Sequence, residues 1–292
     1  MPIKNRTWPD KRITKAPRWA SSDLRDGNQA LVNPMNIEQK GRFFDLLLEC
    51  GFKEIEAGFP SASETEFGFI RGLIEKDKLP DDVWLQVSPP SPFGGRLAPR
   101  EGCECFVAPG RTSQRNAGAP AREQRAQVSL AQLFTHPRAQ VLSPAREELI
   151  RRTIESVRDA KNVIFHMYNA AAPMFRDQVF QNTKQQTVDL AVKHVKLVRS
   201  LVDEAIARGD KTKWQFEYSP EAFSQTEPDF AVEICNAVQD AWFAGRNKHN
   251  ELPIIFNLPA TVEVATPNNY ADQVRFFFQL ARGEDLQRGP PS

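Results

Sequence analysis

The sequence predicts an α/β fold built on a parallel β-sheet, and two observations support this prediction. Strand-like and helix-like patterns alternate along most of the 292-residue chain, with strands centred near residues 20, 56, 85, 165, 216 and 256. Most intervals between these centres are about 30 to 50 residues, which is the spacing expected of βα units. Six such units fit either an open parallel sheet or part of a (β/α)8 barrel.

Composition and charge narrow the class of protein. The chain is 40% hydrophobic and has a formal net charge of +1, so it can bury a large core and has no strong field for nucleic acid or an acidic membrane. It contains no apolar run long enough to span a bilayer, and its basic amino terminus lacks the apolar segment of a secretory signal. We therefore expect a soluble intracellular protein.

The loop after the first predicted strand, residues 18–22, carries Arg25 next to Asp26. At the end of a strand, a carboxylate can hold a divalent cation and a guanidinium can stabilise a developing oxyanion. An isolated Arg–Asp pair is more often a solvated salt bridge, so the rest of the chain must decide between these interpretations. Asn33 is predicted to cap the next helix, which would run from residue 34 to residue 50.

Capping residues and glycines set the limits of the other predicted helices. Ser63 and Glu66 form the pattern of a capping box, and so do Thr183 and Gln186, whose long helix ends before Gly209. The predicted helices are 63–75, one starting at 143–144, 183–208, 228–244 and 269–281, and the predicted strands after the first are 54–59, 83–87, 162–168, 214–218 and 253–258.

Residues 88–141 interrupt the alternation of strands and helices. This stretch holds seven of the chain's 22 prolines and seven arginines, but no Lys, Asp, Ile or Tyr. Such a segment cannot easily bury a core, so we expect a disordered insertion. The predicted organisation is a lead (1–16), the first part of a catalytic domain (17–87), the insertion (88–141), the rest of that domain (142–281) and a disordered tail (282–292).

The cysteines and two of the histidines give no metal-binding pattern. Cys50 and Cys235 lie in helical patterns and are interpreted as reduced core thiols. His194 lies among lysines and His249 lies in a polar loop, so both are expected to be solvated. The remaining candidates, all inside the insertion and poorly spaced for zinc, are Cys103, Cys105 and His136.

Polar side chains stand at the carboxyl end of every predicted strand. In a (β/α)8 barrel these positions carry catalytic groups, whereas each one alone could be a hydrogen-bonded rim residue. All six ends together are a stronger signal than any single residue. The side chains concerned are Arg25, Asp26, Glu56, Gln86, His166, Glu217, Asn257 and Thr261.

Four segments resemble the 2-isopropylmalate synthase family, which is of the Asp-Arg-Glu metal-dependent Claisen-condensing type. They read DLRDGNQ (23–29), GFKEIEAGFPSAS (51–63), FEYSPE (216–221) and NLPATVE (257–263). The resemblance extends over residues 6–87 and 142–273, and the fixed order of several motifs makes it specific. It implies a TIM barrel that condenses acetyl-CoA with 2-oxoisovalerate in leucine biosynthesis.

The resemblance also implies roles for individual residues. Asp26 matches the metal-binding aspartate, Arg25 the arginine that stabilises the enolate, and Glu217 the active-site glutamate. The metal would be zinc, magnesium or manganese. The family further implies a homodimer, in the cytoplasm or alternatively the mitochondrion, without nucleic-acid or membrane partners. The residues that match the substrate pocket are Gln29, His166 and Thr261.

This chain departs from the family pattern in three ways. The family continues into a strand with a His-x-His metal-ligand pair, but no histidine follows His249 here. Residues 88–141 are expected to have no counterpart in the family, and we expect neither the eighth strand nor the leucine-sensing domain within these 292 residues. We therefore expect impaired turnover from this chain. Alternatives are a non-catalytic fragment that associates with full-length synthase, or a sister acyltransferase such as homocitrate or citramalate synthase.

Overall fold

The computed structural model describes residues 10, 12–89, 147–247 and 251–281, all of which belong to one structural unit. The predicted insertion, apart from Ser88 and Pro89, and the predicted tail lie outside these residues. The same holds for His249 and for the insertion's two cysteines and histidine.

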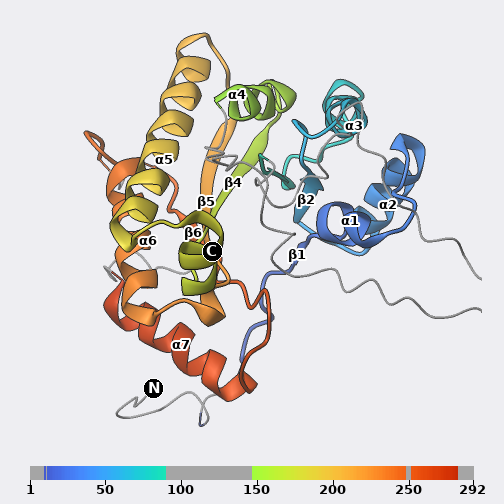
Figure 1. The fold of residues 1–292 in the computed structure, drawn as a ribbon. Coiled ribbons are helices and arrows are strands. Elements are labelled where there is room, and N and C mark those ends of the chain that lie inside the picture. The colour runs from blue at the N-terminus through green and yellow to red at the C-terminus, as the bar shows by residue number, and fades with distance from the viewer. Residues whose placement is uncertain (1–9, 11, 90–146, 248–250, 282–292) are drawn as a thin grey trace, which may run out of the picture. The chain divides into compact units, whose positions relative to one another are not determined.

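Six parallel strands form one sheet in which the order of the strands follows the order of the chain (Figure 1). Each strand pairs in parallel with the next, and the curled sheet makes half of a barrel, as the α/β prediction required. All six predicted strands are confirmed. They are β1 (Ala20–Ser21), β2 (Glu54–Gly58), β3 (Trp84–Val87), β4 (Asn162–Ala170), β5 (Lys213–Glu221) and β6 (Ile255–Phe256).

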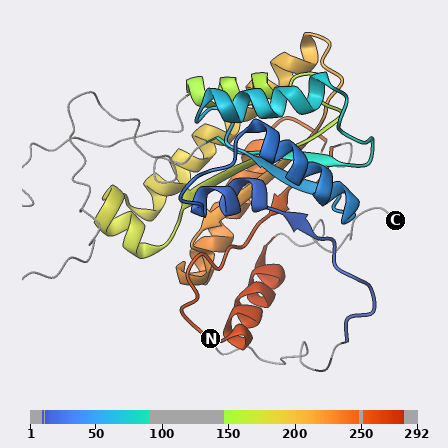
Figure 2. The same ribbon diagram turned by 90° about the vertical axis from the view of Figure 1, so that its right-hand side faces the viewer.

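Helices connect successive strands, as parallel pairing demands. Figure 2 shows α3 and α4 side by side, and Arg152 on α4 reaches Glu64 on α3. Among the described residues, no helix is long and apolar enough to span a membrane. The helices are α1 (Asn28–Ala30), α2 (Ile37–Glu49), α3 (Glu64–Glu75), α4 (Glu147–Ser156), α5 (Lys184–Ala207), α6 (Pro228–Trp242) and α7 (Pro267–Leu280).

The core follows the two-residue period of the strands. On β5, Phe216 and Tyr218 are buried in a hydrophobic cluster with α5 and α6, while the alternate residues Glu217 and Ser219 make polar contacts with His166 of β4. A second cluster surrounds β2 and β3 and includes residues from α2 and α3. Because successive side chains of a strand point to opposite faces, apolar residues pack against the helices and polar ones gather on the other face.

Two predicted helix caps need correction. The N-cap of α2 is Asn36 rather than Asn33, because the Asn36 side chain accepts from the backbone N–H of Gln39, whose side chain in turn accepts from the N–H of Asn36. Ser63 does cap α3 by accepting from the N–H of Glu66. The Glu66 carboxylate, however, makes a contact of 2.5 Å with Lys40. The capping box of α5 is confirmed.

Two predictions about solvent exposure are wrong. His194 is buried, with 2% of its surface exposed, because it lies on the face of α5 that packs into the core together with Val195 and Val198. Cys50 is exposed, because it follows the last residue of α2 at the C-cap. Cys235 is buried in the core, as predicted.

Candidate functional site

A tight turn after β1 presents the Arg25–Asp26 pair. Residues Asp23–Gly27 form a single π-helical turn, in which the N–H groups of Arg25 and Asp26 donate to the carbonyl of Ser22 at 3.1 and 2.8 Å. Leu24 is fully buried and anchors the turn in the core. The anchored turn leaves the Arg25 side chain 19% exposed and the Asp26 carboxylate 58% exposed at the carboxyl end of the sheet.

Arg25 lies between two carboxylates and an aromatic ring. Its Nε is 2.8 Å from Glu56 Oε2, and one terminal nitrogen contacts Asp26 Oδ1. The guanidinium carbon also lies 5.5 Å from the centre of the Phe59 ring. Both Glu56 and Phe59 come from the carboxyl end of β2, so this end fixes the guanidinium from two sides. A fixed, partly buried cation of this kind can stabilise negative charge on a substrate oxygen.

His166 of β4 lies close to polar groups of three other strands, β2, β3 and β5. Its Nδ1 is 3.0 Å from Gln86 Nε2 and 3.5 Å from Glu56 Oε1. Its Nε2 is 2.7 Å from Ser219 Oγ and 3.6 Å from Glu217 Oε1. Burial alone would lower the pKa of His166, but the carboxylates of Glu217 and Glu56 outweigh it and raise the pKa above its usual value.

The carboxylates of this network differ in the direction of their pKa shifts. Burial would raise the pKa of Glu56, but hydrogen bonds and charge from His166 and Arg25 hold it below its usual value. For Glu217, burial prevails over the attraction of His166, and its pKa is raised. Burial likewise raises the pKa of Glu221, despite the attraction of Arg25. Burial also raises the pKa of Asp26, against the attraction of Arg25. The site therefore combines one carboxylate with a lowered pKa and three with a raised pKa.

The predicted site residues divide into a connected group and a rim. Arg25, Asp26, His166 and Glu217 share one electrostatic network at the carboxyl ends of the strands. Gln29 and Thr261 are exposed instead, and the Thr261 hydroxyl accepts from the backbone N–H of Ala222 at 3.2 Å.

Several residues that have no predicted role complete this network. Glu56 is predicted only as a polar residue at a strand end, although it is the strongest partner of Arg25. Ser88 donates to Glu56 at 3.1 Å, and Ser219 accepts from Asn257 Nδ2 at 2.9 Å. The signal for Ser219 and Glu221 was available, because they follow Glu217 at the two-residue period of β5.

The donor set of the site fits a bound metal ion only in part. Asp26 offers an exposed carboxylate, which suits a hard divalent cation. Across residues 12–89, 147–247 and 251–281, however, no group of three His, Cys, Asp or Glu side chains is arranged to hold a metal. Among the described residues, Asp26 is therefore a single candidate ligand rather than part of a complete metal site.

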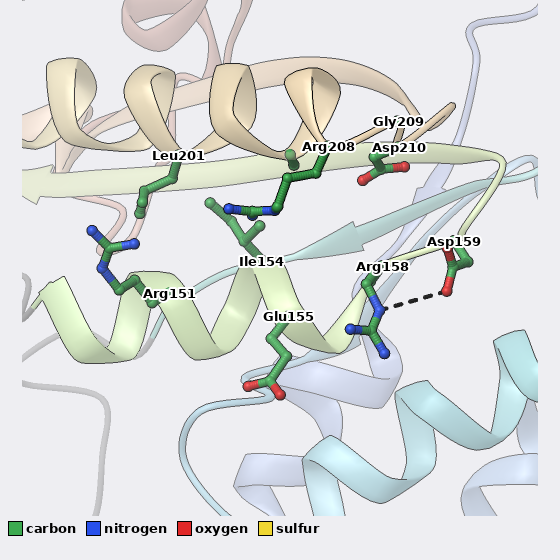
Figure 3. Close-up of a pocket in the computed structure, with 10 residues that line it drawn as sticks. Arg151, Ile154, Glu155, Arg158, Asp159, Leu201, Arg208, Gly209 and Asp210 are labelled. Carbon is green, nitrogen blue, oxygen red and sulfur yellow. Dashed lines mark ion pairs between the residues drawn. The ribbon is translucent and has the colours of Figure 1, made fainter.

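A separate cavity of about 440 Å³ lies between α4 and α5, near the residues that precede β4 and β5 (Figure 3). Its apolar lining residues are Ile154, Leu201 and Ala205, and most of its charged side chains have partners of opposite sign. Glu204 lies 3.6 Å from both Arg151 and Arg208, and Arg158 lies 3.6 Å from Asp159. None of the predicted site residues lines this cavity, which is at the opposite end of these strands.

Comparison with known proteins identifies the family of this chain. Residues 16–89 and 117–286 match the HMGL-like family. The chain is similar to 2-isopropylmalate synthases of Schizosaccharomyces pombe (46% identity over 94% of this chain), Parvibaculum lavamentivorans (44% over 98%) and Ralstonia pickettii (42% over 97%). It spans only 37 to 40% of the length of these relatives. On the strength of the family match, the chain belongs to the HMGL-like family.

Proposed function

We propose that this chain is part of a 2-isopropylmalate synthase, which condenses acetyl-CoA with 2-oxoisovalerate and releases CoA in leucine biosynthesis. The observation that carries the proposal is the Arg25 guanidinium held by Glu56 and Asp26 at the carboxyl end of the sheet. The similarity to 2-isopropylmalate synthases along almost the whole chain supports it.

In this proposal, Arg25 stabilises negative charge on the acetyl oxygen while the methyl group loses a proton. The methyl carbon then attacks the ketone carbon of the 2-oxo acid, and the ketone oxygen takes up a proton to become a hydroxyl group. Water then attacks the thioester carbon, and the C–S bond breaks to free CoA. Because Arg25 is held on three sides, it needs little reorganisation as that charge develops.

The other predicted residues keep the roles that the resemblance implies. Glu217 is the second catalytic residue and His166 binds substrate, and these two buried side chains are 3.6 Å apart. Gln29 and Thr261, on the exposed rim, are proposed to bind substrate as it enters. Asp26 is proposed as the metal ligand, and a divalent cation bound there would polarise the ketone of the 2-oxo acid.

Release of CoA thiol in the presence of acetyl-CoA, 2-oxoisovalerate and a divalent metal tests the proposal. We would assay this chain beside a chimera extended with the remaining length of the S. pombe relative. Little release is expected from the chain alone, because the described residues supply one proposed metal ligand. The chimera should be active, and 2-oxoisovalerate should be preferred to the substrates of homocitrate and citramalate synthases.

Arg25→Gln in the chimera is expected to lower kcat about 100-fold or more. Arg18→Gln is a matched control, because Arg18 forms an exposed ion pair with Glu54 at the other end of β2. Equal activity of Arg25→Gln and the parent chimera would rule out the proposed role of Arg25. A preference for another 2-oxo acid would assign the chain to a sister activity.

A second candidate function is association with full-length synthase without catalysis. It is favoured by the two ends of the described sheet, since β1 pairs only with β2 and β6 only with β5. Open strand edges are templates for pairing with another chain. Co-purification of the isolated chain with an intact synthase would support this candidate, and a monomeric chain that ignores the synthase would exclude it.

A further inference from the structure

A buried ion pair next to the site has no part in the network described above. Lys40 of α2 is fully buried, and its Nζ lies 2.5 Å from Glu66 Oε1 of α3. The ammonium also lies 3.4 Å from the carbonyl oxygen of Ala57 and 5.1 Å from the centre of the Phe69 ring. Lysine is almost never fully buried unless it is paired, and the pairing with Glu66 meets this condition. Burial of both charges still costs solvation energy, which suggests that the pair has a structural role.

The carbonyl that Lys40 contacts belongs to an irregularity in β2. Glu56 is in register with Gln86 of β3, but Val87, the next residue of β3, is in register with Gly58. Ala57 is therefore the extra residue of a β-bulge. Bulges near functional sites commonly redirect a neighbouring side chain.

Gly58 links the bulge to the ion pair, because its position is compatible with the Glu66 carboxylate only in the absence of a side chain. Its backbone has φ +146°, a conformation that residues with a side chain rarely adopt. A Cβ at this position would lie 2.0 Å from Glu66 Oε2. The Glu66 carboxylate thus occupies the space that a side chain at residue 58 would fill.

The residues on both sides of the bulge hold Arg25. Glu56 precedes it and lies 2.8 Å from Arg25 Nε, while Phe59 follows it and stacks near the guanidinium. Glu56 also lies 3.5 Å from His166 Nδ1. A change in the bulge would therefore turn Glu56 away from both of its partners.

We propose that Lys40 and Glu66 are positioning residues, whose buried pair fixes the β2 bulge and thereby aims Glu56 at Arg25 and His166. Neither residue is assigned a contact with substrate. The inference rests on the proposed function only where it takes Arg25 to be a catalytic residue. The positioning itself is a property of the folded chain and can be tested without turnover.

The test is the pKa of His166, measured on the full 292-residue chain by NMR titration of its histidines. The chain has four histidines, and His166→Gln identifies the resonance of interest. Glu56→Gln sets the reference, because loss of that carboxylate lowers the pKa of His166. Lys40→Met is expected to lower the pKa by at least half of the reference shift.

The sign of this shift separates positioning from direct electrostatics. Removing a positive charge, and leaving Glu66 unpaired, would by themselves raise the pKa of a nearby histidine. A lower pKa in Lys40→Met therefore requires that Glu56 has moved. An unchanged or raised pKa, in a variant that is folded, would overturn the proposal.

Two further variants keep the test decisive. Lys78→Met is the matched control, because Lys78 pairs with Asp45 of α2 at 2.8 Å on the surface, and its loss should leave the pKa of His166 unchanged.

If Lys40→Met does not fold, Gly58→Ala perturbs the bulge without changing any charge. It should also lower the pKa, and an unchanged value there would overturn the proposal. Neither result bears on whether the chimera releases CoA.

Discussion

The two ends of the parallel sheet carry the same kinds of charged residue in different surroundings. At the amino end, Lys161 directly precedes β4 and lies 2.6 Å from Asp81, and the two side chains are 48 and 88% exposed. At the carboxyl end, Glu56 and His166 are 3 and 4% exposed and share partners from several strands. Because water screens the exposed pair but not the buried one, removal of one partner should cost more stability at the candidate site than at the opposite end of the sheet.

The largest expected effect is that of Glu56→Ala on stability. The substitution leaves the Arg25 guanidinium, 19% exposed, without its closest buried partner. Removing one member of a buried ion pair typically costs about 3–5 kcal/mol in the free energy of unfolding. Urea unfolding followed by circular dichroism would measure this change.

Lys161→Ala at the other end of the sheet is the matched control. Its carboxylate partners Asp77 and Asp81 remain solvated, so no measurable loss of stability is expected. If the two variants unfold at the same urea concentration, the contrast between the two ends of the sheet is wrong.

The two buried histidines extend the comparison to pH. Unlike His166, His194 has no hydrogen-bond partner at either ring nitrogen among the described residues. Burial, with a smaller effect of Lys193, lowers the pKa of His194 to about 4. The unfolded chain takes up this proton below about pH 6.5 and the folded chain only near pH 4, so the free energy of unfolding falls as the pH drops between these values.

His194→Leu should remove this component of acid sensitivity. Between pH 6.5 and pH 4, the parent chain should lose about 3 kcal/mol more than the variant does. Urea unfolding at several pH values measures this difference. The contributions of carboxylates to the pH dependence are common to both chains and therefore cancel. Parallel stability curves for the two chains would show that His194 is protonated alike in the folded and unfolded states.

The sequence was sufficient to predict the strands and the types of residue at their ends. It could also have placed His194, because Ala191, Val195 and Val198 surround it at helical spacing in a buried stripe. The nearby lysines, which lie on other faces of α5, misled the prediction. Local sequence alone did not reveal the role of Glu56, because the direction of its side chain depends on the register of β2 against β3.

Arg176→Lys is expected to have a smaller effect than the changes above. Arg176 is buried, donates to the carbonyl of Ala171 just after β4, and holds Glu227 through two hydrogen bonds of 2.9 and 2.7 Å. Lysine cannot reproduce this bidentate geometry, so a loss of about 1.5–3 kcal/mol in unfolding free energy is expected.

Lys184→Met provides the control for Arg176. Lys184 contacts the same carboxylate at 3.2 Å, but its side chain is 48% exposed. Its loss should therefore not change the urea midpoint measurably. A larger effect from Lys184 than from Arg176 would mean that exposed pairs at this end of the sheet matter as much as buried ones.

The smallest expected effect on the free energy of unfolding is that of Asn36→Ala. It tests whether the burial of a group or its place near the site decides the cost of its removal. Asn36 caps α2 at the carboxyl end of the sheet, but both hydrogen bonds of its capping box are exposed. If burial decides the energy, Asn36→Ala should cost only about 1 kcal/mol, the usual value of an N-cap, although it lies close to the site. Asn33→Ala, three residues earlier and outside the helix, should cost less. A loss from Asn36→Ala as large as that from Glu56→Ala would mean that the carboxyl end of the sheet is sensitive as a whole, whatever the burial of the group removed.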